Sequence, residues 1–323
     1  MLTINKIPIE DTFAEAFPMT AARLIVTAAT PAWAQTAGTV VTGYASSVIG
    51  CDVEAGIERT LSADETLDGR PGISILMFGF SRDALQKAVV NRVGQCILTC
   101  ATTACYNGLP PVKSKTIRVG GNLRFFSDGW QISKKLEGRR YWRLPVMDGE
   151  FLCEDVFGTI KGVGGGNFLI LAANQSAGLA AAEVAVAAIR NVPGAIMPFP
   201  GGIVRSGSKV GSKYKKVRAS TNDAYCPTLR GQVKSALPAG VNAVYEIVID
   251  GVDQAAVEQA MRVGIRAACT NGVLGITAGN YGGTLGPVHL HLHKLLEAPT
   301  ISPPSPRSIV RCLAMPSRRA TGH

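Results

Sequence analysis

The chain has 323 residues, of which 46% are hydrophobic and only 17% are charged, and its formal net charge is +10. This length and composition favour a globular protein with two ordinary domains. Its eight cysteines are too irregularly spaced for a disulfide framework or a zinc site, so reduced thiols are expected.

No segment of the sequence has the pattern of a membrane span or of an export signal. The longest apolar candidate, residues 169–189, is interrupted by Asn174, Gln175 and Glu183. The first residues, MLTINKIPIEDTF, contain no cationic segment followed by an apolar stretch, so a secretory signal is not expected. We therefore expect a cytoplasmic protein without a membrane partner.

The positive charge favours anionic partners. The cations concentrate in residues 205–218, between Lys113 and Arg143, and in the last two dozen residues. No helix-turn-helix, zinc-finger or RNA-recognition pattern accompanies them, and basic patches without interleaved aromatic residues are more often solvated faces. A small polyanionic ligand fits at least as well, and no nucleic-acid partner is expected.

Strands and amphipathic helices alternate along the chain, and they do so twice. In the first half the patterns predict strands over 22–30 and 71–80, each followed by a helix, over 31–41 and 81–97. In the second half they predict strands over 167–175 and 242–251, followed by helices over 176–190 and 252–269. Ser176 is a natural N-cap for the first of these two helices.

This repetition indicates an internal duplication of one α+β unit. Both halves follow the β-α-β-β-α-β order of the ferredoxin-like split βαβ fold, although only roughly, and both carry the tripeptide RVG, at Arg92 and Arg262. A Rossmann fold is the main alternative, but no strand is followed by GxGxxG opening a helix. We predict two ferredoxin-like lobes, over 1–147 and 148–297, and a disordered Pro- and Arg-rich tail over 298–323.

Two glycine-rich stretches and a row of histidines are further candidates for ligand contact. Residues 161–168, KGVGGGNF, lack the Lys-Ser/Thr end of a P-loop and more often make a tight turn before a strand; residues 279–286, GNYGGTLG, are equally ambiguous. On a strand, His289, His291 and His293 would share one face and could bind a metal. No acidic or cysteine partner is near them, so packing is the favoured interpretation and no metal is expected.

Glu246 is the most informative acid. In the strand AVYEIVIDG it shares a face with Val244 and Val248, so its carboxyl group stands between two valines. If that face is buried, desolvation raises the pKa of Glu246 and makes it a usable general acid or base. The alternatives are an edge strand with the acid in water, or an ion pair with Arg262 or Arg266.

The loop ASTNDAYCPT, residues 219–228, gathers five hydrogen-bonding side chains beside the basic run 205–218. They are Ser220, Thr221, Asn222, Asp223 and Tyr225. Such residues bind a polar ligand, and they equally satisfy local turns.

The motifs FPGGIVRSGSKVGSKY, ASTNDAYCPT, VYEIVIDG and GNYGGTLG, in that order, resemble formylmethanofuran:tetrahydromethanopterin formyltransferases. In the N-terminal half IEDTFAEAF, SVIGCDVEAGIE, DGRPG, RVGQC and DGEFLCEDVFG are also similar to that family, so the resemblance covers residue 1 to about 297. It implies two similar ferredoxin-like lobes in a cytoplasmic homotetramer. It also implies direct transfer of a formyl group between the amine of methanofuran and N5 of tetrahydromethanopterin, both of them substrates, with no tightly bound cofactor.

The resemblance places Glu246 at a conspicuous carboxylate of the family's cleft, as the catalytic residue. The substrate-binding residues are expected within the matched motifs: Gly201, Gly202, Lys209, Lys213, Ser220, Asn222, Asp223, Tyr225, Asn280 and Tyr281. Arg205, Lys215, Lys216 and Arg218 would add attraction for methanofuran, which carries glutamates.

Family members from methanogens tend to be acidic, whereas this chain is basic. The resemblance therefore points to a bacterial relative in formaldehyde oxidation, where the formyl group moves to methanofuran within a complex that contains metallohydrolase subunits. The rival hypothesis is a non-catalytic binding or assembly subunit that keeps the fold.

Overall fold

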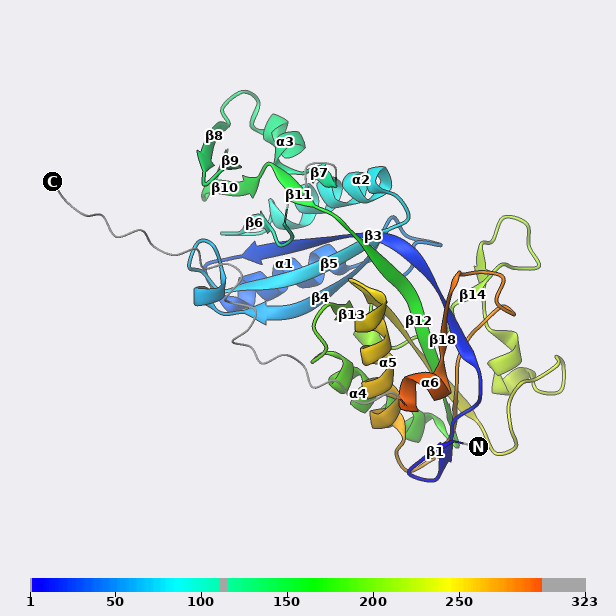
Figure 1. Ribbon diagram of the computed structural model, residues 1–323. Helices are drawn as coiled ribbons and strands as arrows, with labels where there is room; N and C mark the ends of the chain where they lie inside the picture. Colours follow the sequence, from blue (N-terminus) through cyan, green and yellow to red (C-terminus); the bar gives the residue numbers. More distant parts are fainter. Residues whose placement is uncertain (1, 111–114, 298–323) are drawn as a thin grey trace.

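One sheet of twelve strands runs through both halves of the chain (Figure 1). The computed structural model describes residues 2–110 and 115–297, and the tail for which the composition predicts disorder lies outside them. Among the helices of these two ranges, none combines the length and the apolar character that a bilayer span requires.

Four strands and two helices form the main frame of the first half. Along the chain they are β3 (Phe13–Thr27), α1 (Pro31–Thr42), β4 (Glu54–Leu61), β5 (Gly72–Gly79), α2 (Arg82–Arg92) and β6 (Ala104–Asn107). In the sheet the strands lie in the order β6-β3-β5-β4, and β3 is antiparallel to both of its neighbours. Alternate residues such as Ile73, Ile75 and Met77 pack with Ala37 of α1 and Leu85 of α2, so both helices cover the same face.

The second half has the same arrangement. Its elements are β12 (Ile160–Ala172), α4 (Gln175–Ile189), β13 (Ala195–Ile196), β16 (Ala243–Gly251), α5 (Gln254–Ala268) and β17 (Val273–Thr277). The strand order is β17-β12-β16-β13, with antiparallel pairing throughout. A second core forms where Phe168 and Ile170 of β12 and Ile247 of β16 meet Ala185 of α4 and Met261 of α5.

Two long strands join the halves. β3 pairs with the first part of β12, from Ala21 opposite Ile160 to Phe17 opposite Gly164, and Figure 1 shows the two strands running side by side. Each strand then continues into its own half. The strands predicted over 22–30 and 167–175 therefore begin too late, because each is extended by pairing with the other half.

The glycine-rich stretch 161–168 lies inside β12. The expected turn before a strand is thus wrong. The register between β12 and β16 shifts between Val163 and Gly166, and Gly165 has a φ of 84°. A bulge of this kind suits glycine, because a left-handed φ places no Cβ in conflict with the backbone.

Smaller elements extend this frame. The hairpin β8 (Ile132–Leu136) and β9 (Arg139–Val146), with β10 (Gly149–Glu154), lengthens the sheet beyond β6, and β18 (Val288–His291) adds to the start of β3. The remaining elements are β1 (Thr3–Ile4), β2 (Ile7–Pro8), β7 (Thr116–Arg118), α3 (Gly120–Leu123), β11 (Val156–Gly158), β14 (Lys209–Val210), β15 (Ala219–Ser220) and α6 (Leu292–Glu297).

The four main helices begin at side-chain caps that the sequence carries. Thr30, Ser81, Asn174 and Asp253 each accept a hydrogen bond from a backbone N–H of the first helical turn. The predicted cap Ser176 is wrong: the cap of α4 is Asn174, two residues earlier, and the hydroxyl of Ser176 donates to the side chain of Asn174 at 2.8 Å. The helix predicted over 81–97 ends at Arg92 and continues as a π-helical turn, Val93–Ile97.

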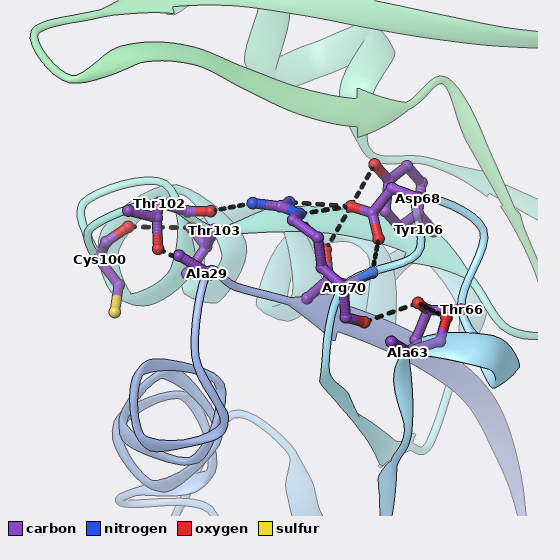
Figure 2. A network of polar contacts seen from close by, with 10 residues as sticks. Ala29, Ala63, Thr66, Asp68, Arg70, Cys100, Thr102, Thr103 and Tyr106 are labelled. Carbon is purple, nitrogen blue, oxygen red and sulfur yellow. Dashed lines mark hydrogen bonds and ion pairs between the residues drawn. The ribbon is translucent and has the colours of Figure 1, made fainter.

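A polar network fixes the loop between β4 and β5 to the strands beside it (Figure 2). Asp68 accepts hydrogen bonds from Thr27, Arg70 and Tyr106 at 2.7, 2.9 and 3.0 Å, and Arg70 also donates to the carbonyl of Thr102. Although burial opposes ionisation, these donors hold the pKa of Asp68 below its usual value. Because the side chains of this network are hydrogen-bonded to one another, we assign it a structural role.

Candidate functional site

The segment 204–210 lines two adjoining pockets. The large pocket has a cavity volume of about 50 Å³, or about 510 Å³ with the space that is open to solvent, and the small pocket has about 40 Å³, or about 290 Å³ counted in the same way. The large pocket is built from both halves of the chain: Glu15, Phe17, Ser47, Val48, Ile49, Glu54, Gly165, Asn167, Phe199, Ser208, Val210, Val248, Gly279, Tyr281 and Leu285. The small pocket is lined by Leu169, Val204, Arg205, Ser206, Gly207, Asn222, Tyr225, Cys226, Val244 and Glu246.

Glu246 lies on β16 and lines the small pocket. Only 3% of the residue is exposed, and its backbone exchanges two hydrogen bonds with Val204. The hydroxyl of Ser208, which lines the large pocket, donates to Oε1 of Glu246 at 2.6 Å, while Oε2 has no partner among the described residues. Glu246 is therefore a buried carboxyl group with one free oxygen.

Burial raises the pKa of Glu246, and the Ser208 hydrogen bond opposes that rise. The edge-strand alternative is wrong, because β16 lies between β12 and β13. The ion-pair alternative is also wrong, since Arg262 and Arg266 donate instead to the carbonyls of Leu295 and Leu296 at 2.7 Å. A buried carboxyl group of raised pKa binds a proton more readily than an exposed one, which suits a general acid or base.

The polar loop 219–228 divides into residues that line the small pocket and residues that stabilise the loop itself. Asn222 and the half-buried Tyr225 line the pocket. Lys209 binds Asp223 at 2.6 Å, and the hydroxyl of Ser220 donates to the carbonyl of Gly211 at 2.8 Å. The last three side chains thus hold the hairpin of β14 and β15 and the turn that follows it.

Gly201, Gly202 and Lys213 also lie outside the linings of both pockets. Gly201 and Gly202 form a turn with φ values of 67° and 87°, and the preceding Phe199 is the residue that lines the large pocket. Lys213 is exposed in the loop between β14 and β15. Pro200 separates Phe199 from this left-handed turn, a conformation that suits glycine.

The loop 279–286 brings Tyr281 into the large pocket but directs Asn280 away from it. The Asn280 amide donates to the Thr12 hydroxyl and to the carbonyl of Phe13, both at 3.0 Å. The hydroxyl of Tyr281 accepts a hydrogen bond from the backbone N–H of Val210 at 2.6 Å. The loop N–H groups point at a carboxylate of the protein itself, that of Glu15.

Several acidic or hydroxyl residues of the site were not predicted from the sequence, and the four that bear most on its chemistry are acids or contact one. They are Glu15, Ser208, Glu54 and Asp250. Asp250 lies four residues after Glu246 on the same strand face, so the alternation that singled out Glu246 also carries a signal for Asp250. Glu15 stands between Ala14 and Ala16, and its role depends on a loop about 270 residues away, which gives no local signal.

The three histidines do not share a strand face. His289 and His291 lie on β18 with ring centroids 4.8 and 5.3 Å from that of Phe13, whereas His293 is in α6 and contacts the carbonyl of Ile9 at 2.9 Å. Within residues 2–110 and 115–297, no three His, Cys, Asp or Glu side chains are grouped closely enough to hold a metal ion.

Known proteins resemble this chain over nearly its whole described length. Family models match residues 2–146, as formylmethanofuran-tetrahydromethanopterin formyltransferase, and residues 149–295, as the proximal lobe of the same family. The formylmethanofuran–tetrahydromethanopterin formyltransferase of Methylococcus capsulatus is 56% identical over 299 residues, which cover 91% of this chain and 100% of the relative.

Two further matches come from Methylorubrum extorquens. A subunit of its formyltransferase/hydrolase complex is 55% identical over 308 residues, covering 92% of this chain and 98% of that one. A crystal structure of the formyltransferase/hydrolase complex (FhcABCD) with methylofuran contains a chain of 54% identity with a TM-score of 0.88, covering 92% of this chain and 99% of that chain. The present chain belongs to the formylmethanofuran–tetrahydromethanopterin formyltransferase family.

Proposed function

We propose that this chain is a formyltransferase that moves a formyl group between methanofuran and N5 of tetrahydromethanopterin, with both as substrates. The observation that carries the proposal is the buried Glu246, which lines the small pocket, has one free oxygen and accepts a hydrogen bond from Ser208 of the large pocket. A high identity to named formyltransferases over nine-tenths of the chain supports it.

In this mechanism the methanofuran amine attacks the formyl carbon of formyl-tetrahydromethanopterin directly. A new C–N bond forms, the carbonyl oxygen becomes an oxyanion, and the attacking nitrogen gives its proton to the Glu246 carboxylate. The C–N5 bond then breaks as Glu246 returns the proton to N5. Because its pKa is raised by burial, Glu246 can both accept and donate this proton. The two pockets would hold the two substrates in contact with it.

The residues expected to bind substrate take two roles in this proposal. Asn222, Tyr225 and Tyr281 contact substrate, since they line the pockets. The others hold these residues in place or attract the anionic end of methanofuran from outside the pockets; they are Gly201, Gly202, Lys209, Lys213, Ser220, Asp223 and Asn280.

We also infer that the chain consists of two ferredoxin-like lobes from an internal duplication, 1–147 and 148–297. The strand orders β6-β3-β5-β4 and β17-β12-β16-β13 support this, because both correspond to the order 4-1-3-2 of a split βαβ unit. The proximal-lobe family model, which begins at residue 149, supports a boundary near 147.

The chain is further proposed to act in the cytoplasm as a homotetramer that associates with metallohydrolase subunits, and to pass formyl groups towards methanofuran. Its 55% identity to a component of a formyltransferase/hydrolase complex supports the association. Co-purification of hydrolase subunits from native lysate is the expected result, and a lone tetramer would contradict it.

Replacing Glu246 by Gln tests the catalytic role. Gln keeps the volume and the Ser208 hydrogen bond but cannot exchange a proton, so turnover should fall by roughly 10²- to 10⁴-fold with both Michaelis constants within about threefold. The measurement is a formyl-transfer assay with both substrates, with oligomeric state and thermal unfolding as controls. A folded Glu246→Gln that retains more than about a third of wild-type turnover rules the role out. A wild-type chain without transfer activity indicates the rival, a non-catalytic assembly subunit.

A further inference from the structure

Glu15 is a buried carboxylate in the large pocket for which the mechanism above has no use. It lies on β3 and is 3% exposed. Oε1 accepts hydrogen bonds from the backbone N–H groups of Tyr281 and Gly283, both at 2.6 Å, and Oε2 from those of Leu285 and Gly286, at 2.7 and 3.1 Å. Each oxygen therefore has two donors, which leaves little room for a ligand to bind Glu15 itself.

The loop is shaped for this contact. Gly282 and Gly283 have φ values of 68° and 79°, in the left-handed region that other residues rarely adopt, and this turns successive N–H groups inward. A concave row of backbone N–H groups ordinarily binds a free anion. Here the anion is a side chain on a strand about 270 residues earlier in the sequence, so Glu15 fixes the loop to the sheet.

Tyr281 is clamped at both ends. Its backbone N–H binds Glu15, and its hydroxyl contacts the segment 208–210, accepting from the N–H of Val210 at 2.6 Å and lying 3.4 Å from the carbonyl of Ser208. The hydroxyl of Ser208 in turn donates to Glu246 at 2.6 Å. A continuous path of hydrogen bonds thus runs from Glu15 through Tyr281 and Ser208 to Glu246.

We propose that Glu15 is a positioning residue for Glu246, acting through Tyr281 and Ser208. This inference rests on the proposed catalytic role of Glu246. A hydrogen bond from Ser208 favours the ionised form of Glu246, so any change that displaces Ser208 makes Glu246 harder to ionise. Glu15 thereby controls the pH range of formyl transfer without touching the reacting atoms.

Glu15→Gln is the first test. Gln keeps the length of the side chain, but its NH₂ group faces two N–H donors that lose their acceptor. We expect turnover to fall about 10- to 100-fold with both Michaelis constants within about threefold, and the acidic limb of the pH–turnover profile to move up by about half a unit or more. Tyr281→Phe, which removes only the hydroxyl, should shift the same limb in the same direction.

A double variant separates positioning from a general loss of structure. If Glu15 acts through Glu246, then Glu15→Gln should cost little further turnover in a Glu246→Gln background. The matched control is Glu65→Gln, because Glu65 is an exposed carboxylate that also accepts a backbone N–H, from Ser62 at 3.0 Å, and it lies outside both pockets. Its pH profile should equal that of the wild type.

The outcomes are distinct. An unshifted pH profile in folded Glu15→Gln and Tyr281→Phe, or losses that multiply in the double variant, would overturn the positioning role and leave the catalytic role of Glu246 intact. Full turnover in Glu246→Gln alone would overturn both.

Discussion

Glu54 and Asp250 are two buried acids that face each other from the two halves of the chain. They are 5% and 0% exposed, and a backbone N–H binds one oxygen of each, from Val48 and Gly165, at 3.0 Å. Burial raises the pKa of both carboxyl groups, and the charge of Glu54 raises that of Asp250 further. The second oxygen of each has no hydrogen-bond partner among the described residues, and we infer that the two carboxyl groups share one proton.

This pair should make stability fall as the pH rises. Free Asp and Glu titrate near pH 4, whereas the folded pKa of Asp250 is well above its usual value, so the folded state keeps a proton that the unfolded chain releases. The stabilisation of the folded state by this proton is complete below about pH 4 and is lost as the pH rises through the folded pKa. Glu54→Gln removes one charge while its amide still donates to Asp250.

We therefore expect the decrease in melting temperature between pH 5 and pH 8 to be a few degrees smaller in Glu54→Gln than in the wild type, because each pKa unit is worth about 1.4 kcal/mol. Circular dichroism melts of both proteins at four pH values measure this decrease in melting temperature. Glu65→Gln is the control, since the pKa of Glu65 is lowered and its effect lies below this pH range. An equal or steeper decrease in Glu54→Gln would show that the pair does not share a proton.

Among single residues, the sequence could identify those that the alternation of side chains along a strand marks. Glu246 was singled out because one acid between two valines on one strand face has a local signature, and the burial on which that hypothesis depends is observed. Glu15 and Ser208 were missed because their importance comes from contacts across the fold. Asn280 and Asp223 were recognised as polar loop residues, but whether such a side chain binds a ligand or its own loop depends on geometry that composition does not contain.

Among helices and strands, the order was predictable, and most boundaries lie within about two residues of the prediction; β3, β12 and the end of α2 are the exceptions. The alternation of apolar residues identified both strand–helix pairs of each half. The extra length of β3 and β12 came from their mutual pairing, which is a tertiary effect. The repeated tripeptide RVG did carry structural information, since Arg92 and Arg262 are both buried and both bind backbone carbonyls.

Arg92 holds the segment between α1 and β4, which contributes Ser47, Val48 and Ile49 to the large pocket. It donates to the carbonyls of Val41, Gly43 and Tyr44 at 2.8 Å and pairs with Asp52 at 2.5 Å. Lysine keeps the charge but cannot replace this planar set of donors. Arg92→Lys should lower the free energy of unfolding by roughly 1.5–3 kcal/mol and raise the Michaelis constant for at least one of the two substrates.

Arg262→Lys is the matched comparison. Arg262 donates to the carbonyl of Leu295 and to Gln259, and neither lines a pocket. We expect a similar loss of stability in urea unfolding but unchanged Michaelis constants. If both variants change substrate binding equally, the segment before β4 has no special part in the site.

Over the whole molecule, the net charge of +10 matters most where it lies beside the pockets. Arg205 lines the small pocket, and Lys213, Lys215, Lys216 and Arg218 are exposed in the loop next to it. Lys209 also lies in this basic segment, but its charge is paired with Asp223. A cluster of exposed cations attracts an anionic ligand over about 10 Å at 0.1 M salt, and higher salt screens that attraction.

The Michaelis constant for methanofuran should therefore rise about three- to tenfold between 0.05 and 0.5 M salt, since its glutamates supply the negative charge. Replacing Lys215 and Lys216 by Ala should raise the constant at low salt and flatten the salt dependence. The control replaces Lys134 and Lys135, which are exposed on the hairpin strand β8 of the first half, and should leave the slope unchanged. Turnover at saturating substrate should stay constant in all three proteins, because screening acts on the encounter and not on proton transfer at the buried Glu246. A flat salt response in the wild type would mean that the basic loop has no part in substrate capture and that the pockets alone provide the affinity.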